Sequence, residues 1–500
     1  MTVLKFVTRT VFIATLGKSY LGINGLFSDI LTMLSLTELG VDTAINFQLY
    51  KPLAEHDEKR VRVLMKFYKQ AYRIIGTTIL VLGLCLIPAL PVLIRDYDSL
   101  EPLGINATLI FLLYLLQSVS SYLFFAYRSA ILKADQKMYV LDVAGYGITI
   151  ATNITQILIL VFLGDFVIYT ACVIAFNLLR NFVYATIATR RYPYCFKRED
   201  DSLSKGEVLG LLKDCGALFL FKVNNVVLKA TDNLVLSMFS GLGIVGLYSN
   251  YLLFYTTIRS LLNQLYNAVK ASMGNLFAVG DVARRYEFFQ VMNFLTVFLC
   301  GTAGVVVAVC ADELISTWVG SDYVVAQPLA ALIGLEILFY GLKLNLNQIR
   351  NVSGAFRQVW YRPVISAIVN LSVSVALVQV IGIYGVLCGT ILADIFANFL
   401  VDPSVIHRYS FENYRPVSEY YIKNLGYLCV LLGCVFIDGM VCRLLFMGHG
   451  WLSVAFHAFI VVLTVPSALA IVYHRTREFK YLIGFARGTI KKIVSNLRKH

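Results

Sequence analysis

Long apolar stretches constrain this chain more than any other feature of its sequence. A stretch of about 20 apolar residues crosses a bilayer as a helix, because a helix satisfies its own backbone hydrogen bonds. Such stretches cover residues 74–94, 107–127, 140–163, 166–187, 288–310, 365–380, 425–442 and 451–473. Less apolar stretches of similar length, with polar residues in their middles, cover residues 20–48, 211–239, 242–276 and 325–347. Hydrophobic residues make up 58% of the 500 residues, charged residues only 15%, and the mean hydropathy is +0.72. The sequence therefore predicts an all-α, multi-pass membrane protein of about 14 transmembrane helices.

The distribution of lysine and arginine over the connecting loops predicts the orientation of these helices. Basic residues crowd every second connection, as in residues 59–69 and 190–205, whereas the connections between them carry few, chiefly Lys18, Arg95 and Arg443. The positive-inside rule places the basic side in the cytoplasm, which predicts that both termini are cytoplasmic. This topology accounts for most of the net charge of +13 without a nucleic-acid partner. The basic tail 476–500 is either an interfacial helix on anionic membrane lipids or a solvated segment.

A short repeat divides the chain into two halves. Residues 21–31 read LGINGLFSDIL and residues 242–252 read LGIVGLYSNYL, so seven of eleven positions agree. Both copies begin a predicted membrane helix of the same direction, six helices apart, as two parallel halves of a transporter would. We therefore expect an N-terminal lobe at 1–195, a cytoplasmic linker at 196–210, a C-terminal lobe at 211–410, two further helices at 411–475 and the basic tail.

Polar residues within four predicted spans form stripes, each on one helix face at 100° per residue. They are Asn24, Ser28, Ser35, Glu38, Asp42 and Asn46; Lys222, Asn225, Lys229, Asp232 and Asn233; Ser249, Thr256, Arg259, Ser260, Asn263, Asn267 and Lys270; and Glu336, Tyr340, Lys343 and Asn347. A charge in the membrane costs about 2.5–3.5 kcal/mol unless it faces a partner or a cavity. The stripes predict either a polar interior cavity or polar contacts between helices in a dry bundle.

The charges in these stripes favour a cavity, because cations outnumber nearby carboxylates. The cations are Lys222, Lys229, Arg259, Lys270 and Lys343, and the carboxylates are Asp214, Asp232 and Glu336. Lys270 and Lys343 are long enough to extend to the cytoplasmic edge instead. A cavity with surplus positive charge suits an anionic head group such as a phosphate or pyrophosphate.

Two segments resemble a known family. Residues 17–76, which begin GKSYLGINGLFSDIL, and residues 230–276, which begin ATDNLVLSMFSGLGIVGLYSN, are similar to the Wzx-type flippases of bacterial polysaccharide synthesis. These flippases belong to the multidrug, oligosaccharidyl-lipid and polysaccharide exporter (MOP) superfamily. The resemblance implies two pseudo-symmetric six-helix lobes around a central cavity, with two C-terminal helices appended. It also implies a function in O-antigen or capsule synthesis: the transfer of undecaprenyl-pyrophosphate-linked oligosaccharides to the outer face of the bacterial cell (inner) membrane by alternating access.

The resemblance also suggests roles for the stripe residues. We expect the lipid-linked oligosaccharide to be bound by Lys222, Asn225, Lys229, Arg259, Asn263 and Lys343. We expect a proton or sodium ion to be coupled through Glu38, Asp42, Asp232 and Glu336. Asp232 is alternatively a counterion for the lysines, and Glu38 and Asp42 alternatively pair locally with Lys51 or Arg73. Partners implied by the resemblance are a polysaccharide polymerase and glycosyltransferases, and no cofactor is expected.

Two other function classes stay open at this point. A drug or small-cation exporter of the same superfamily predicts that carboxylates dominate the cavity. A membrane polysaccharide polymerase usually needs a larger outer loop than residues 311–327, and the six scattered histidines form neither a zinc-site pattern nor a catalytic triad. We therefore expect a protein that is not an enzyme. The first predicted span, 1–16, is short for the family, so either the true start lies upstream or the first helix is short.

Overall fold

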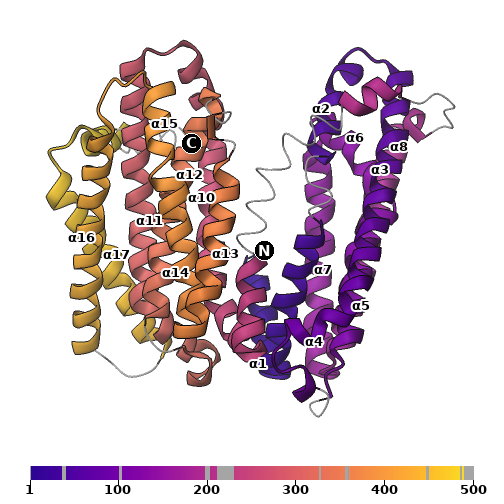
Figure 1. Ribbon diagram of the computed structural model, residues 1–500, viewed down its shortest axis with the longest axis horizontal. Coiled ribbons are helices and arrows are strands. Elements are labelled where there is room, and N and C mark those ends of the chain that lie inside the picture. The colour runs from indigo at the N-terminus through magenta and orange to yellow at the C-terminus, as the bar shows by residue number, and fades with distance from the viewer. Residues whose placement is uncertain are drawn as a thin grey trace, which may run out of the picture. The chain divides into compact units, whose positions relative to one another are not determined.

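The computed structural model describes residues 2–35, 41–100, 104–196, 203–210, 230–325, 328–354, 358–359, 361–445, 450–484 and 487–488. Within these ranges every regular element is a helix, which confirms the all-α prediction (Figure 1). The chain divides into two compact units, Met1–Gly246 and Leu247–His500. The lobe and linker boundaries expected from the sequence stay predictions.

The N-terminal unit is a bundle of helices in antiparallel succession (Figure 1). Its main elements are α1 (Thr2–Leu34), α2 (Val41–Ala54), α3 (Glu58–Leu86), α4 (Leu90–Leu93), α5 (Ala107–Leu123), α6 (Ser129–Ala134), α7 (Met138–Phe162) and α8 (Phe166–Arg191). Helix α5 packs between α3 and α8, and α7 packs against α8 and α1. Side-chain caps set three of the starts: Asp57, Asn106 and Asp165 each accept a hydrogen bond from a backbone N–H three residues on.

A glycine divides the first long helix. Gly17 in α1 has φ 79° and ψ −173°, a conformation that residues with a Cβ rarely adopt. The sequence expectation of a first span at 1–16 and a second beginning near residue 20 agrees with this break. The repeat segment 21–31 therefore begins just after the interruption.

The first copy of the repeat contacts the first residues of the second copy within the N-terminal unit. A Cβ added to Gly22 would overlap the backbone carbonyl of Leu242, and one added to Gly246 would overlap the carbonyl of Lys18. Such close backbone approach is typical of glycines spaced at helical intervals in membrane helices. The glycines shared by the two copies thus include residues that bring α1 and the first turn of α10 (Leu242–Val279) into contact.

The C-terminal unit contains the rest of α10 and a second helical bundle (Figure 1). Its further elements are α11 (Val282–Val319), α12 (Leu329–Ser353), α13 (Arg362–Ile381), α14 (Ile383–Ala393), the π-helical segment η9 (Asp394–Phe399), α15 (Asp402–Tyr409), α16 (Val417–Leu444) and α17 (Trp451–Tyr473). Helix α11 packs against α12, α16 and α17, and α14 packs against α13 and α12. Gly304 and Gly334 face each other at a close approach of the α11 and α12 backbones.

Many of these helices have the length and exposed apolar surface of membrane spans. In the described ranges, nine helices are long and apolar enough to cross a bilayer, and the bent pair Ala107–Leu123 and Ala126–Ala134 makes up to ten. Large apolar side chains are exposed along them: Val143 by 71%, Phe162 by 78% and Phe436 by 75%. A lipid environment covers such faces, so this is a multi-pass membrane protein. The expected count of fourteen is compatible with the structure, since the predicted span 211–239 lies largely outside the described residues.

Two arginines, one in the last turn of α12 and one at the start of α13, are buried. Arg350 is 4% exposed and Arg362 5%, and between them lies Asp402, which is fully buried. Arg350 Nη1 donates to the two carboxylate oxygens of Asp402 at 2.9 and 2.8 Å, and Arg362 Nη1 donates to the same carboxylate. The charge of these two residues is neutralised inside the unit, where the cluster ties α12 and α13 to α15.

Candidate functional site

The predicted polar stripes of α10 and α12 meet at Tyr340 in the C-terminal unit. Asn263 Nδ2 donates a hydrogen bond of 2.8 Å to the Tyr340 hydroxyl. One turn earlier on α10, the guanidinium carbon of Arg259 lies 4.7 Å from the centre of the Tyr340 ring. A cation above an aromatic face is stabilised by the ring quadrupole, so Tyr340 orients the Arg259 side chain.

One turn further along α12, the partly buried Lys343 forms an ion pair with a buried carboxylate. Its Nζ donates to both carboxylate oxygens of Asp394 at 2.7 Å each, and Asn398 Nδ2 donates to Asp394 Oδ1 at 2.8 Å. Asp394 is the first residue of the π-helical segment η9, a geometry that is frequent at functional sites. Asp394 is not among the carboxylates expected near the cations, which were Asp214, Asp232 and Glu336, and its ion pair neutralises Lys343.

Glu336 instead hydrogen-bonds the hydroxyl of Tyr255, one turn before Arg259 on α10. Its side chain is buried, and the rings of Tyr255 and Tyr340 meet edge to face at a centroid distance of 5.8 Å. Arg259 and Asp394 also act electrostatically on the Glu336 carboxyl. The site is therefore one connected network of two carboxylates, two cations and two tyrosines.

Four of the ten predicted site residues come together in this network: Arg259, Asn263, Glu336 and Lys343. Lys222, Asn225, Lys229 and Glu38 lie outside the described residues, and so does the side chain of Asp42. Asp232 is buried in the N-terminal unit, in the helical segment 230–240. The roles assigned to all ten residues stay predictions.

Sequence reasoning missed two carboxylates that the structure connects to the stripes. Asp394 was recognisable as a lone carboxylate in the apolar stretch 383–400. In the N-terminal unit, Asn233 Nδ2 donates to Asp29 Oδ2 at 2.5 Å, and Asp29 belongs to the first repeat copy. Near it, the Tyr114 hydroxyl donates to Asn24 Oδ1 at 2.7 Å. The stripe of Asn24 thus serves at least partly in contacts between helices.

The charge distribution of the network leaves one cation available for a ligand. Lys343 is neutralised by Asp394, and Lys270, also on α10, is exposed. Arg259 makes no ion pair with the residues that the structure describes, and it is only half-buried. A guanidinium held by an aromatic face, with the amide of Asn263 one turn away, can bind an oxyanion through several N–H donors.

Comparison with known proteins identifies the fold. No protein-family profile and no curated protein sequence matches the chain. Among solved structures, the lipid II flippase MurJ in an inward closed conformation has a TM-score of 0.64 at 15% identity, over 95% of this chain and 97% of its own. An inward-facing multidrug resistance MATE family transporter of the MOP superfamily has a TM-score of 0.58 at 15% identity, over 82% of this chain and 95% of its own. This chain has the MurJ and MATE fold.

A third structure with this fold, a ligand complex of the MATE multidrug transporter DinF-BH, has a TM-score of 0.56 at 14% identity, over 82% of this chain and 93% of its own. The MurJ alignment therefore takes in more of the chain than either MATE alignment does. At these identities the likeness establishes the MurJ and MATE fold, and the choice of substrate depends on the residues of the site.

Proposed function

We propose that this protein is a Wzx-type flippase that moves undecaprenyl-pyrophosphate-linked oligosaccharide repeat units from the cytoplasmic to the outer face of the bacterial cell membrane by alternating access. The observation that carries the proposal concerns Arg259. Its guanidinium lies over the ring of Tyr340 inside a membrane protein and makes no ion pair with the described residues. Desolvating an arginine without a carboxylate is costly, and an anionic substrate group offsets that cost. The pyrophosphate of the lipid carrier is such a group.

The chemistry of the neighbouring residues supports the same assignment. Asn263 and Tyr340 supply polar groups next to Arg259, suitable for phosphate or sugar oxygens. A pyrophosphate-linked oligosaccharide cannot cross the hydrocarbon core by itself, because its charges and hydroxyl groups would lose their hydrogen bonds to water. The fold supports the proposal as well, since the MurJ alignment covers 95% of the chain.

Coupling and cellular context are part of the proposal. The buried carboxyl of Glu336, linked to Tyr255, is suited to take up a proton or a sodium ion during the transport cycle. The loop charges favour cytoplasmic termini in the inner membrane. A flippase of this type would work with glycosyltransferases that build the repeat unit and a polymerase that uses it, in the synthesis of O-antigen or capsule.

The test is transport in proteoliposomes of a radiolabelled undecaprenyl-pyrophosphate-linked oligosaccharide. Arg259→Met removes the charge and keeps much of the side-chain volume, and the matched control is Lys270→Met, which removes an exposed cation from the same helix. Loss of a charge-assisted contact to the pyrophosphate is worth about tenfold in the initial rate. We expect that loss for Arg259→Met and near-normal transport for Lys270→Met. Equal rates for the two variants would contradict the assigned role of Arg259.

A second candidate, a drug or organic-cation exporter, is favoured by the likeness to the MATE transporters. It requires the carboxylates Glu336 and Asp394 to bind the cation, with Arg259 opposing that binding. Proteoliposomes under a proton or sodium gradient separate the two candidates. Export of a fluorescent organic cation that Arg259→Met accelerates, without any transport of the lipid-linked sugar, would replace the flippase proposal.

A further inference from the structure

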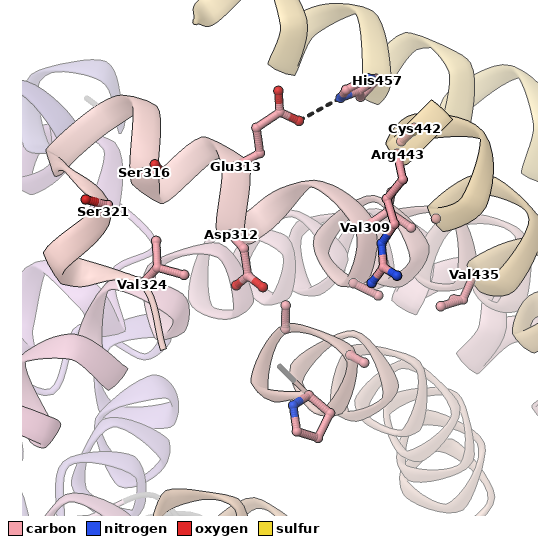
Figure 2. Close-up of a pocket in the computed structure, with 15 residues that line it drawn as sticks. Val309, Asp312, Glu313, Ser316, Ser321, Val324, Val435, Cys442, Arg443 and His457 are labelled. Atoms are coloured by element: carbon pink, nitrogen blue, oxygen red, sulfur yellow. Dashed lines mark hydrogen bonds and ion pairs between the residues drawn. The ribbon is translucent and has the colours of Figure 1, made fainter. Parts of the chain in front are cut away.

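A polar cavity lies in the C-terminal unit, away from Arg259. Its volume is about 720 Å³, and its walls are the C-terminal ends of α11 and α16, the N-terminal ends of α12 and α17, and the turn that follows α11 (Figure 2). None of the residues of the Arg259 network lines it. The loop-charge distribution predicts that these helix ends face outward, so the cavity would open at the outer surface of the membrane.

Opposite charges line this cavity from different helices. Figure 2 shows the Asp312 carboxylate from α11 and the Arg443 side chain from α16 both directed into it. The Tyr251 hydroxyl donates to Asp312 Oδ1 at 2.6 Å, which fixes the orientation of the carboxylate and leaves its second oxygen for another donor. A ligand with a positive group at one end and a negative group at the other matches this arrangement.

Beside Asp312, a buried pair has unused hydrogen-bonding capacity. His457 Nδ1 and Glu313 Oε2 are 2.6 Å apart, and the side chains are 2% and 14% exposed. His457 Nε2 and Glu313 Oε1 are both buried, and neither has a hydrogen-bond partner among the described residues. When Nδ1 carries the proton that it shares with the carboxylate, Nε2 is a bare acceptor. Two unfilled acceptors, one of them on a carboxylate, next to the second carboxylate of Asp312 point to a ligand rich in N–H donors, because an unsatisfied buried acceptor is destabilising.

The polar cavity continues into an apolar groove. Ala308, Ala331 and Val435 line both the polar cavity and a neighbouring cavity of about 180 Å³ between α11, α12 and α16. A further apolar cavity of about 280 Å³ shares Leu338 and Leu428 with that one. A polar chamber at a helix end, joined to an apolar groove along the same helices, has the shape and polarity of a lipid with its head group at the surface and a chain at hydrocarbon depth.

We propose that this cavity is a binding site for a zwitterionic phospholipid with a primary amine, whose head group is phosphoethanolamine. The ammonium group donates to Asp312 and Glu313, the phosphate binds Arg443, and one acyl chain lies in the groove between α12 and α16. A primary ammonium has three N–H donors, which suits the acceptors of the Asp312, Glu313 and His457 cluster. This lipid site does not depend on the proposed transport function. It gives the protein a second ligand, a membrane phospholipid.

The experiment is native mass spectrometry of the full chain purified in detergent and titrated with defined lipids. Phosphatidylglycerol has the phosphate without the amine, and phosphatidylcholine keeps the positive charge but replaces the N–H donors with methyl groups. On the unmodified protein, we expect phosphatidylethanolamine to bind about tenfold more tightly than either, the worth of one charge-assisted hydrogen bond. Equal binding of the three lipids would overturn the proposal without the need for any variant.

Variants then assign the residues. Asp312→Asn is expected to abolish the preference for phosphatidylethanolamine over phosphatidylglycerol, whereas Arg443→Gln is expected to weaken both. The matched control is Asp322→Asn, an exposed carboxylate in the same turn region that does not line the cavity, and we expect it to bind as the unmodified chain does. Identical behaviour of Asp312→Asn and Asp322→Asn would overturn the assignment. Displacement of the bound lipid by soluble phosphoethanolamine at equal concentration would overturn the role of the groove.

Discussion

Replacing Asp402 with asparagine tests whether the buried arginines of the C-terminal unit depend on one carboxylate. Asp402 is fully buried, and both Arg350 and Arg362 donate to it. Asparagine keeps the shape and one acceptor but removes the negative charge, so two guanidinium groups are left buried without a counterion. Removing one partner of a buried ion pair costs about 3–5 kcal/mol. We expect Asp402→Asn to lower the free energy of unfolding by that amount.

The assay is a titration with sodium dodecyl sulfate in mixed micelles, followed by tryptophan fluorescence and circular dichroism. The matched control is Glu207→Gln, which breaks the 2.6 Å pair with Arg60 in the N-terminal unit, where the two side chains are 41% and 37% exposed. Solvent screens an exposed ion pair, so this control should unfold at the same detergent concentration as the unmodified protein.

A third variant separates loss of charge balance from loss of packing. Replacing Arg350 and Arg362 with methionine and Asp402 with leucine removes all three charges and keeps the volume apolar. Such replacements of a buried triad are often neutral or stabilising, so this variant should unfold close to the unmodified protein. The reasoning would be refuted if Asp402→Asn unfolded at the same detergent concentration as Glu207→Gln. It would also be refuted if the triple variant were no more stable than Asp402→Asn.

Three further predictions concern other parts of the molecule. Lys343→Met leaves the buried Asp394 without its cation and should destabilise the protein by about 3 kcal/mol in the same titration, and adding Asp394→Leu should recover most of that loss. In Gly22→Ala the added methyl group would overlap the backbone of the facing helix, so this variant should lower the free energy of unfolding by about 1–3 kcal/mol. Gly243→Ala has open space at the added methyl group and should lower it much less. In a cysteine-free background, Asp322→Cys should react with an impermeant maleimide added outside intact cells, and labelling only after permeabilisation would reverse the predicted orientation.

The helical class and the polar stripes were predictable from the sequence, because both depend on local periodicity. Apolar stretches of about 20 residues dictate membrane helices whatever their neighbours are. A stripe follows from the helical repeat, so Arg259, Asn263 and Lys343 could be assigned to faces before any helix was placed. The spans expected at 1–16 and from residue 20 are joined in α1, and the structure places the break between them at Gly17, whose positive φ residues with a Cβ rarely adopt.

Only the tertiary structure decided which charges neutralise one another. Lys343 pairs with a carboxylate 51 residues away, and His457 pairs with Glu313, 144 residues away. Such pairs depend on where helices cross, and the sequence gives the direction of a side chain around its own helix but not the helix that it faces. For this reason the sequence overestimated the free positive charge of the C-terminal unit. Asp394 neutralises the charge of Lys343. Arg259 has no ion pair among the described residues and lies over the ring of Tyr340 instead.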